Sequence, residues 1–170
     1  MTTRTKIEDL LQELEQEAAT TRRVLERVPE GSLGWKPHDR SMSLGQLALH
    51  IATVPGGVAT LASTPVAQVP NLDNEPTASS AAELLPALDE SIAKARGILQ
   101  GLDDASMQAT LRIMAGDREL MAIPRAGFLR AIMLNHWYHH RGQLSVYLRE
   151  LNVPVPSIYG PSADENPFTG

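Results

Sequence analysis

AGFLRAIMLNHWYHHRGQLSVYLREL, residues 126–151, is the most informative segment of the sequence. Pro124 precedes it and Pro154 follows it, as is typical of the two ends of a helix. One face of the predicted helix carries a stripe at helical spacing, which consists of Leu129, Met133, His136, His140, Gln143, Leu144, Tyr147 and Leu151. At about 100° per residue, His136 and His140 lie about 40° apart, so both imidazoles are expected to point into the protein.

Three further segments have the apolar period of amphipathic helices. The first spans residues 5–28, and the third spans residues 80–102. The second begins at Ser43, which forms a capping box with Gln46, and Pro55 is expected to kink or end it. The apolar face of this second helix contains Leu44, Leu47, Ile51, Val54 and Val58.

Four amphipathic helices around one core predict an all-α fold, a four-helix bundle. The length of 170 residues predicts a single domain, residues 1–170. Two short apolar runs around Gly116 and Asp117 predict a small β-hairpin before the last helix, and the Pro- and Ser-rich tail at 153–170 is expected to be loop. The connection at 62–79 is too long for a tight turn, so helices that follow each other in sequence need not be simple neighbours in space.

Composition excludes several classes of function. The chain contains no cysteine, which rules out disulfides, thiolate metal sites and a cysteine nucleophile. Its net charge of -5 argues against nucleic-acid binding, which needs a basic face. Residues 41–72 lack charged side chains, but proline, glycine and polar residues interrupt them, so we expect a buried helix and no membrane span. The acidic N-terminal segment does not resemble a signal peptide, which favours a cytoplasmic location.

The histidines carry the strongest indication of chemistry. His136 and His140, at positions i and i+4 of one helix, can bind one divalent metal ion. The alternative is a pair of core histidines that hydrogen-bond to the backbone or to each other. His50 favours the metal, because it lies on the apolar face of an uncharged helix that offers few other partners for a third inward imidazole. Three neutral imidazoles with an open position are the ligand set of a catalytic zinc, nickel or iron site.

Other polar residues give weaker indications of a functional role. Trp137 follows the first histidine of the pair where zincin peptidases have glutamate, so a peptidase is not expected. His38 lies in a predicted loop, where most histidines are solvated. Gln143 faces inward and could bond to a ligand or be satisfied within the core. Arg141 lies about 140° from His136 and is expected at the surface or an interface, and Tyr147 is expected in the core.

Three blocks of the sequence together resemble the DinB superfamily, also called the DinB/YfiT-like metalloenzymes. They are WKPHDRSMSLGQLALH (35–50), NHWYHHRGQL (135–144) and VPSIYGPSADE (155–165). The resemblance implies an up-down-down-up four-helix bundle, usually a homodimer, with nickel or zinc as the metal. Carried over by position, it implies His50, His136 and His140 as the metal ligands, whereas His139 matches a family residue that is not a ligand.

Relatives of this kind include enzymes that use glutathione, mycothiol or bacillithiol for S-transfer or isomerisation. The resemblance therefore implies a metal-dependent enzyme that acts on a small-molecule substrate. Its expected reaction is thiol-dependent S-transfer or isomerisation, with a low-molecular-weight thiol as a candidate second cofactor. A metal-dependent hydrolase and a non-catalytic metal-binding bundle stay open as alternatives. The sequence identifies no catalytic acid or base. Asp164 and Glu165 could fold over the site, but a solvated tail accounts for them equally well.

Overall fold

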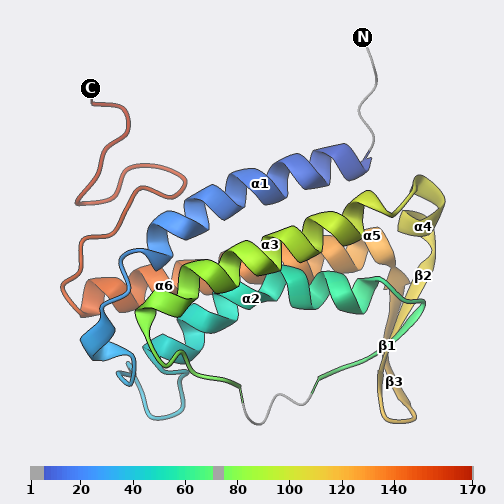
Figure 1. The fold of residues 1–170 in the computed structure, drawn as a ribbon, viewed down its shortest axis with the longest axis horizontal. Helices are drawn as coiled ribbons and strands as arrows, with labels where there is room; N and C mark the ends of the chain where they lie inside the picture. Colours follow the sequence, from blue (N-terminus) through green and yellow to red (C-terminus); the bar gives the residue numbers. More distant parts are fainter. Residues whose placement is uncertain (1–5, 71–74, 170) are drawn as a thin grey trace.

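The computed structural model describes residues 6–70 and 75–169, in which four long helices carry a small sheet at one end of the bundle (Figure 1). The long helices are α1 (Lys6–Leu25), α2 (Leu44–Ala62), α3 (Leu84–Gln100) and α6 (His136–Glu150), and α6 continues from α5 (Arg125–Phe128) through a π-helical segment at Leu129–Asn135. Short helical turns lie at Glu30–Ser32, at Ala81–Glu83 and in α4 (Asp104–Gln108). The predicted start of the first helix at residue 5 lies outside the described residues.

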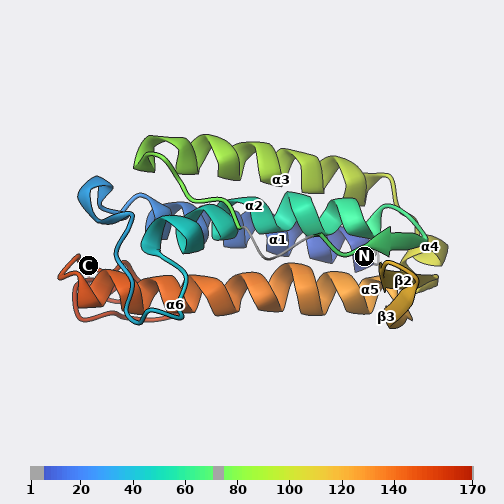
Figure 2. The same cartoon turned by 90° about the horizontal axis from the view of Figure 1, so that it is seen from below.

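The helices have the up-down-down-up order that the resemblance implied. In Figure 1, α1 and α6 run in one direction along the bundle, and α2 and α3 run in the other. α2 packs against α3 and α6, and α1 completes the bundle by packing against the same two helices. Figure 2 shows α2 between α3 and α6. Because α2 and α3 are parallel, the chain must return along the whole bundle between them, which explains the long connection.

The structure is mostly helical but also contains a small three-stranded sheet, so the predicted all-α class holds only approximately. The expected hairpin is confirmed as β2 (Thr110–Ala115) and β3 (Arg118–Pro124), which pair antiparallel. Gly116, with a φ of 59°, supplies the left-handed conformation that its turn requires. The prediction missed a third strand, β1 (Val66–Gln68), which pairs parallel with β2 and lies in the long connection at 62–79. A three-residue strand has no period of its own that the sequence could reveal.

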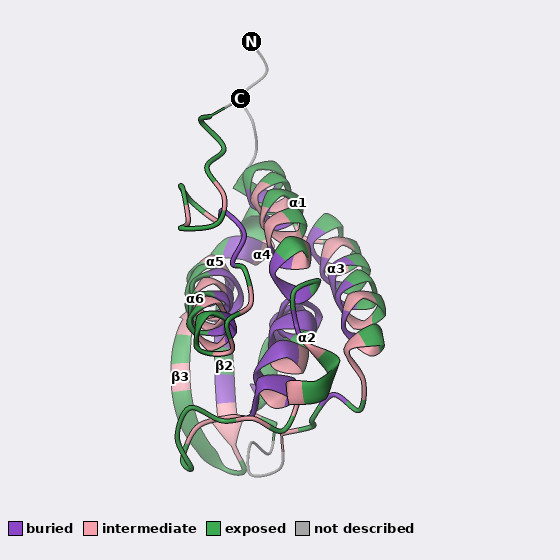
Figure 3. Ribbon diagram, turned by 90° about the vertical axis from the view of Figure 1, so that its left-hand side faces the viewer, coloured by how far each residue is buried: buried purple, intermediate pink, exposed green. Residues whose placement is uncertain are grey.

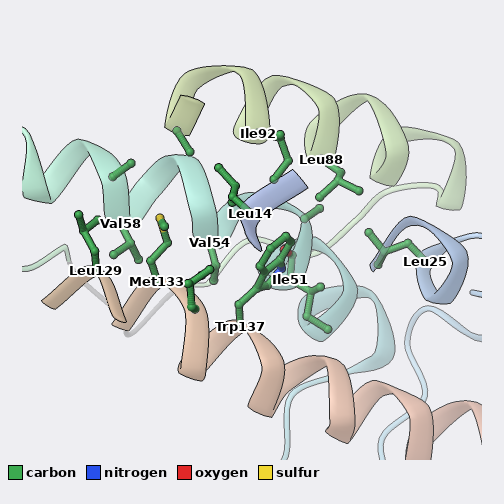
Figure 4. Packing of buried hydrophobic residues seen from close by; sticks show 14 of the residues in the cluster. Leu14, Leu25, Ile51, Val54, Val58, Leu88, Ile92, Leu129, Met133 and Trp137 are labelled. Atoms are coloured by element: carbon green, nitrogen blue, oxygen red, sulfur yellow. The ribbon is translucent and has the colours of Figure 1, made fainter. Parts of the chain in front are cut away.

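The core helix α2 begins as predicted but continues past Pro55. The Ser43–Gln46 capping box is present, because each side chain bonds to the other residue's backbone N–H. Pro55 lacks an N–H, so the carbonyl oxygen of Ile51, four residues earlier, needs another donor. The indole Nε1–H of the fully buried Trp137 donates to that oxygen at 2.8 Å, and Figure 4 shows the two side chains together in the core. This bond compensates for the proline. Of the two expected effects of Pro55, a kink or an end of the helix, the end does not occur there.

α2 is long and apolar enough to cross a membrane by length and composition, with a mean hydropathy of 1.3. However, 61% of its 18-residue apolar window is buried inside the protein. Figure 3 shows α2 as the most continuously buried helix, surrounded by α1, α3 and α6. Its hydropathy is therefore accounted for by its place at the centre of the bundle.

The tight contact between α2 and α3 allows a matched prediction. A Cβ on Gly56 would lie 2.9 Å from the backbone oxygen of Ser91 and 3.0 Å from its Cα, whereas a Cβ on Gly57 would meet nothing within 4 Å. We expect Gly56→Ala to lower the free energy of unfolding by about 1–3 kcal/mol, because backbone must move. Gly57→Ala should be neutral or stabilise by up to about 1 kcal/mol through helix propensity. Urea unfolding of both variants measures the difference, and equal effects would contradict this packing.

Candidate metal centre

The three histidines named from the sequence come together between α2 and α6. The Nε2 atoms of His50 and His136 are 3.1 Å apart. The ring centroid of His140 lies 4.7 Å from that of His50 and 4.3 Å from that of His136. One nitrogen atom from each ring can be chosen so that all three lie within 4.8 Å of one another. We call these residues the histidine triad.

The triad lies at the rim of the core, and not inside it as the predicted stripe implied. The interior face of the last helix is Leu129, Met133, Trp137, Arg141, Leu144 and Leu148. On an α-helix, side chains four residues apart point in directions that differ by about 40°. The wider turns of the π-helical segment at Leu129–Asn135 cancel this rotation, so residues at four-residue spacing stay on the interior face. Trp137 and Arg141 therefore point inward, and the preceding residues His136 and His140 are only partly buried.

The Nδ1 atoms of two triad members are already occupied. The Nδ1 of His50 lies 3.1 Å from Oε2 of Glu75, and the Nδ1 of His140 lies 2.7 Å from Oε1 of Gln143. An acceptor at Nδ1 holds the proton there and leaves the Nε2 lone pair free. Metal-binding histidines are usually oriented in this way by a carboxylate or a carbonyl oxygen. His50 and His140 are therefore prepared to bind a metal ion through Nε2.

The electrostatics favour the neutral imidazoles that a metal ion needs. Burial lowers the pKa of His50 and outweighs the opposing effect of the Glu75 carboxylate. Burial also lowers the pKa of His136, helped by the neighbouring His50. Burial is also the main reason why the pKa of His140 is lowered, and it outweighs the hydrogen bond with Gln143, which acts to raise that pKa. Three closely spaced imidazoles cannot all accept protons without mutual repulsion.

The donor set fits a divalent metal ion. Two nitrogen ligands about 2.0–2.1 Å from a tetrahedral zinc ion lie roughly 3.3 Å apart. The 3.1 Å between the Nε2 atoms of His50 and His136 is close to that spacing. Partial exposure of the triad leaves one side of the site open for water or a ligand, as in catalytic sites.

The lowered pKa values predict that the metal-free protein loses stability in mild acid. Below the ordinary histidine value of 6.5, the unfolded chain takes up protons that the folded triad does not. The free energy of unfolding should therefore fall as the pH drops below 6.5, until the lower folded pKa values are reached. Thermal unfolding in a chelator at pH 7.5, 6.5 and 5.5 measures this. The triple variant H50Q/H136Q/H140Q should show a smaller fall, and an unchanged fall would refute the assignment.

Glu75 was not predicted from the sequence, since it lies in a connection without periodicity. Of the other polar residues, His38 and Tyr147 make their contacts outside the triad, whereas Gln143 contacts one of its members. His38 is exposed and accepts a hydrogen bond from the backbone N–H of Arg40. Tyr147 is partly buried and packs edge-to-face against Trp35, with ring centroids 5.4 Å apart. Gln143 is exposed, so the prediction that it faces inward is wrong, and its Oε1 lies against Nδ1 of His140.

Arg141 is buried within the bundle, so the prediction that it lies at the surface or an interface is wrong. It is 1% exposed, and its Nη2 lies 2.5 Å from Oε2 of Glu17 on α1. The tail residues Asp164 and Glu165 are also neither over the site nor free in solvent. Asp164 forms an ion pair with Arg149, and Glu165 forms one with Arg23. These contacts tie the tail to the ends of α6 and α1.

Solved structures of several bacterial proteins share this fold. A DinB-like protein from Bacillus cereus ATCC 10987 superposes with a TM-score of 0.70, at 24% identity, over 89% of this chain and 97% of its own. YjoA of Bacillus subtilis, also DinB-like, gives 0.64 at 20% identity, over 85% and 92% of the two chains. YfiT of Bacillus subtilis, a probable metal-dependent hydrolase with an unusual four-helix bundle topology, gives 0.64 at 16% identity, over 89% and 92%.

The sequence comparisons agree with the fold. The uncharacterized protein YrdA of Bacillus subtilis (strain 168) is 26% identical over 161 residues, which are 94% of this chain and 91% of that protein. The family model described as the DinB family matches residues 1–167, which is nearly the whole sequence and includes the segments that carry the triad. The chain belongs to the DinB family.

Proposed function

We propose that this protein is a metal-dependent hydrolase of a small-molecule substrate, with His50, His136 and His140 as the ligands of one nickel or zinc ion. The observation that carries the proposal is the arrangement of the triad, in which one nitrogen of each ring lies within 4.8 Å of the others and the three side chains stay partly exposed. YfiT, which shares the fold, is a probable metal-dependent hydrolase, and this supports the same reaction class here. A divalent ion in such a site lowers the pKa of water and polarises a carbonyl group.

The residues of the chain have three roles in this proposal. The triad provides the three neutral nitrogen donors and keeps them on the rim, where a substrate reaches them without passing through the core. Gln143 and Glu75 lie 2.7 Å and 3.1 Å from the Nδ1 atoms of His140 and His50, on the side of each ring away from Nε2. The interior, from Trp137 to Leu148, is packed with buried side chains, so the substrate site must lie on the solvent side of the triad.

Thiol-dependent transfer or isomerisation is the second candidate. The open side of the triad can admit a soluble thiol, and the chain has no cysteine of its own to supply sulfur. In this alternative, a low-molecular-weight thiol takes the place that water takes in hydrolysis. The homodimer that the resemblance implies also stays a prediction, which sedimentation of the purified protein tests.

The test uses tag-free protein, depleted of metal and then reloaded with zinc or nickel. A panel of small esters, amides and electrophiles is assayed with and without added glutathione, bacillithiol or mycothiol. Turnover that requires the metal and no thiol supports the hydrolase, and turnover that requires both supports the transferase. H136A, assayed in parallel, should lose the activity in either case. If no metal binds, or if H136A retains full turnover, the proposed metalloenzyme is wrong.

A further inference from the structure

Among the described residues, Glu75 is the one whose carboxylate contacts the triad. Its Oε2 lies 3.1 Å from the Nδ1 of His50, and both side chains are 18% exposed. The Nε2 of the same ring points the other way, toward His136. The carboxylate therefore lies behind His50 as seen from the centre of the triad, where it can orient a ligand without being one.

The backbone of Glu75 is held in place by the start of α2. Gln46 accepts from the N–H of Ser43 through Oε1, and its Nε2 donates to the carbonyl oxygen of Glu75 at 3.4 Å. Gln46 and His50 are four residues apart, so they lie on the same face of α2. The segment that crosses over Gln46 therefore brings the side chain of Glu75 beside His50, one turn further along.

A second contact fixes the same segment. The N–H of Ala78 donates to the carbonyl oxygen of Gly45 at 3.3 Å. A Cβ on Gly45 would lie 3.1 Å from Cγ2 of Thr77 and 3.1 Å from the carbonyl oxygen of Leu33, so glycine allows the chain to approach this closely. The cap of α2 thus has two roles, since it begins the helix and anchors the carboxylate.

We infer that Glu75 is a positioning residue of the metal centre, which holds the Nδ1 proton of His50 and directs its Nε2 toward the metal. This inference rests on the proposed metal site. The role of Gln143 at His140 is the same, but a carboxylate also stabilises the positive charge that a bound cation induces on the imidazole. Glu75 should therefore contribute both orientation and charge, whereas Gln143 contributes orientation.

The expected effects follow from these two contributions. Loss of such a partner weakens metal binding by about 10–100-fold. We expect E75A to fall in this range. E75Q keeps an acceptor oxygen and loses the charge, so its loss should be smaller than that of E75A. E90A is the matched control, because it removes an exposed carboxylate from α3 and changes the net charge equally.

The experiment titrates the metal-free proteins with Co²⁺ and Zn²⁺ and records calorimetric affinity and the visible spectrum of the cobalt form. Nitrogen-15 NMR of the metal-free proteins reports which nitrogen of His50 carries the proton. Wild type should hold it on Nδ1, and E75A should show a mixture of tautomers with an unchanged thermal midpoint. If wild type binds metal and folded E75A binds it equally well, the positioning role is wrong. If wild type itself binds no metal, the proposed function fails instead.

Discussion

Replacing any one histidine of the triad with alanine should reduce zinc or nickel affinity by two to three orders of magnitude. Complete four-ligand zinc sites contribute about 10–16 kcal/mol of apparent binding free energy. One ligand therefore contributes roughly 3–4 kcal/mol, which is about 10²–10³ in affinity. The loss should be similar for H50A, H136A and H140A, because the metal needs donors from both helices. Calorimetric titration and elemental analysis of tag-free protein measure it.

H139A is the matched control for this series. His139 lies next to His140 on α6, with ring centroids 5.1 Å apart, but it is exposed. Its removal should leave the metal content near one equivalent per chain. Wild type with metal at 100 times Kd should gain about 2.7 kcal/mol of stability, and each triad variant should lose this gain. A loss in H139A as large as that in H140A would show that the metal is held elsewhere.

Glu17→Ala should destabilise the protein by about 3 kcal/mol, although Glu17 lies on α1, outside the triad. The guanidinium of Arg141 is buried, and Glu17 is its carboxylate partner. Removing one partner of a buried ion pair typically costs about 3–5 kcal/mol, because the remaining charge is uncompensated. Arg141 keeps Thr21 and Tyr159 as hydrogen-bond partners, which places the expected cost at the low end. For a protein of this length, Tm should fall by about 6–12 °C.

The control for this prediction lies two residues away. Glu15 pairs with Arg96 across α1 and α3, but the two side chains are 46% and 43% exposed. Exposed pairs contribute about 1 kcal/mol or less, so E15A should shift Tm by only a few degrees. Differential scanning calorimetry of both variants separates the two cases. If E17A and E15A lower Tm by comparable amounts, the ion pair between Arg141 and Glu17 is accessible to water.

Much of the fold could be predicted because it depends on local pattern. The face of α2 formed by Leu44, Leu47, Ile51, Val54 and Val58 is buried as expected. The cap at Ser43 and the turn at Gly116 follow from short-range chemistry in the same way. The continuation of α2 past Pro55 could not be foreseen, since the donor to the freed carbonyl is Trp137, which lies far away in sequence.

The site could be predicted only in part, for a related reason. The triad was identifiable because an imidazole on an apolar helical face finds few polar partners besides a metal ion or another imidazole. Its position on the rim depends on the π-helical segment, which regular helical spacing does not reveal. Arg141 could not be placed without its partner Glu17, which is supplied by α1. Glu75 reaches His50 from an irregular connection, where no periodicity indicates which way a side chain points.

The order of the helices also affects how the protein can fold during synthesis. α2 is apolar over most of its surface, and one of the two helices that it packs against most is α6, the last to leave the ribosome. Until α6 emerges, the nascent chain exposes that side of α2 and has only one of the two halves of the triad. Chains that end before residue 136 lack all of α6 and should therefore aggregate or be degraded, and metal binding by the proposed triad can only follow the synthesis of α6.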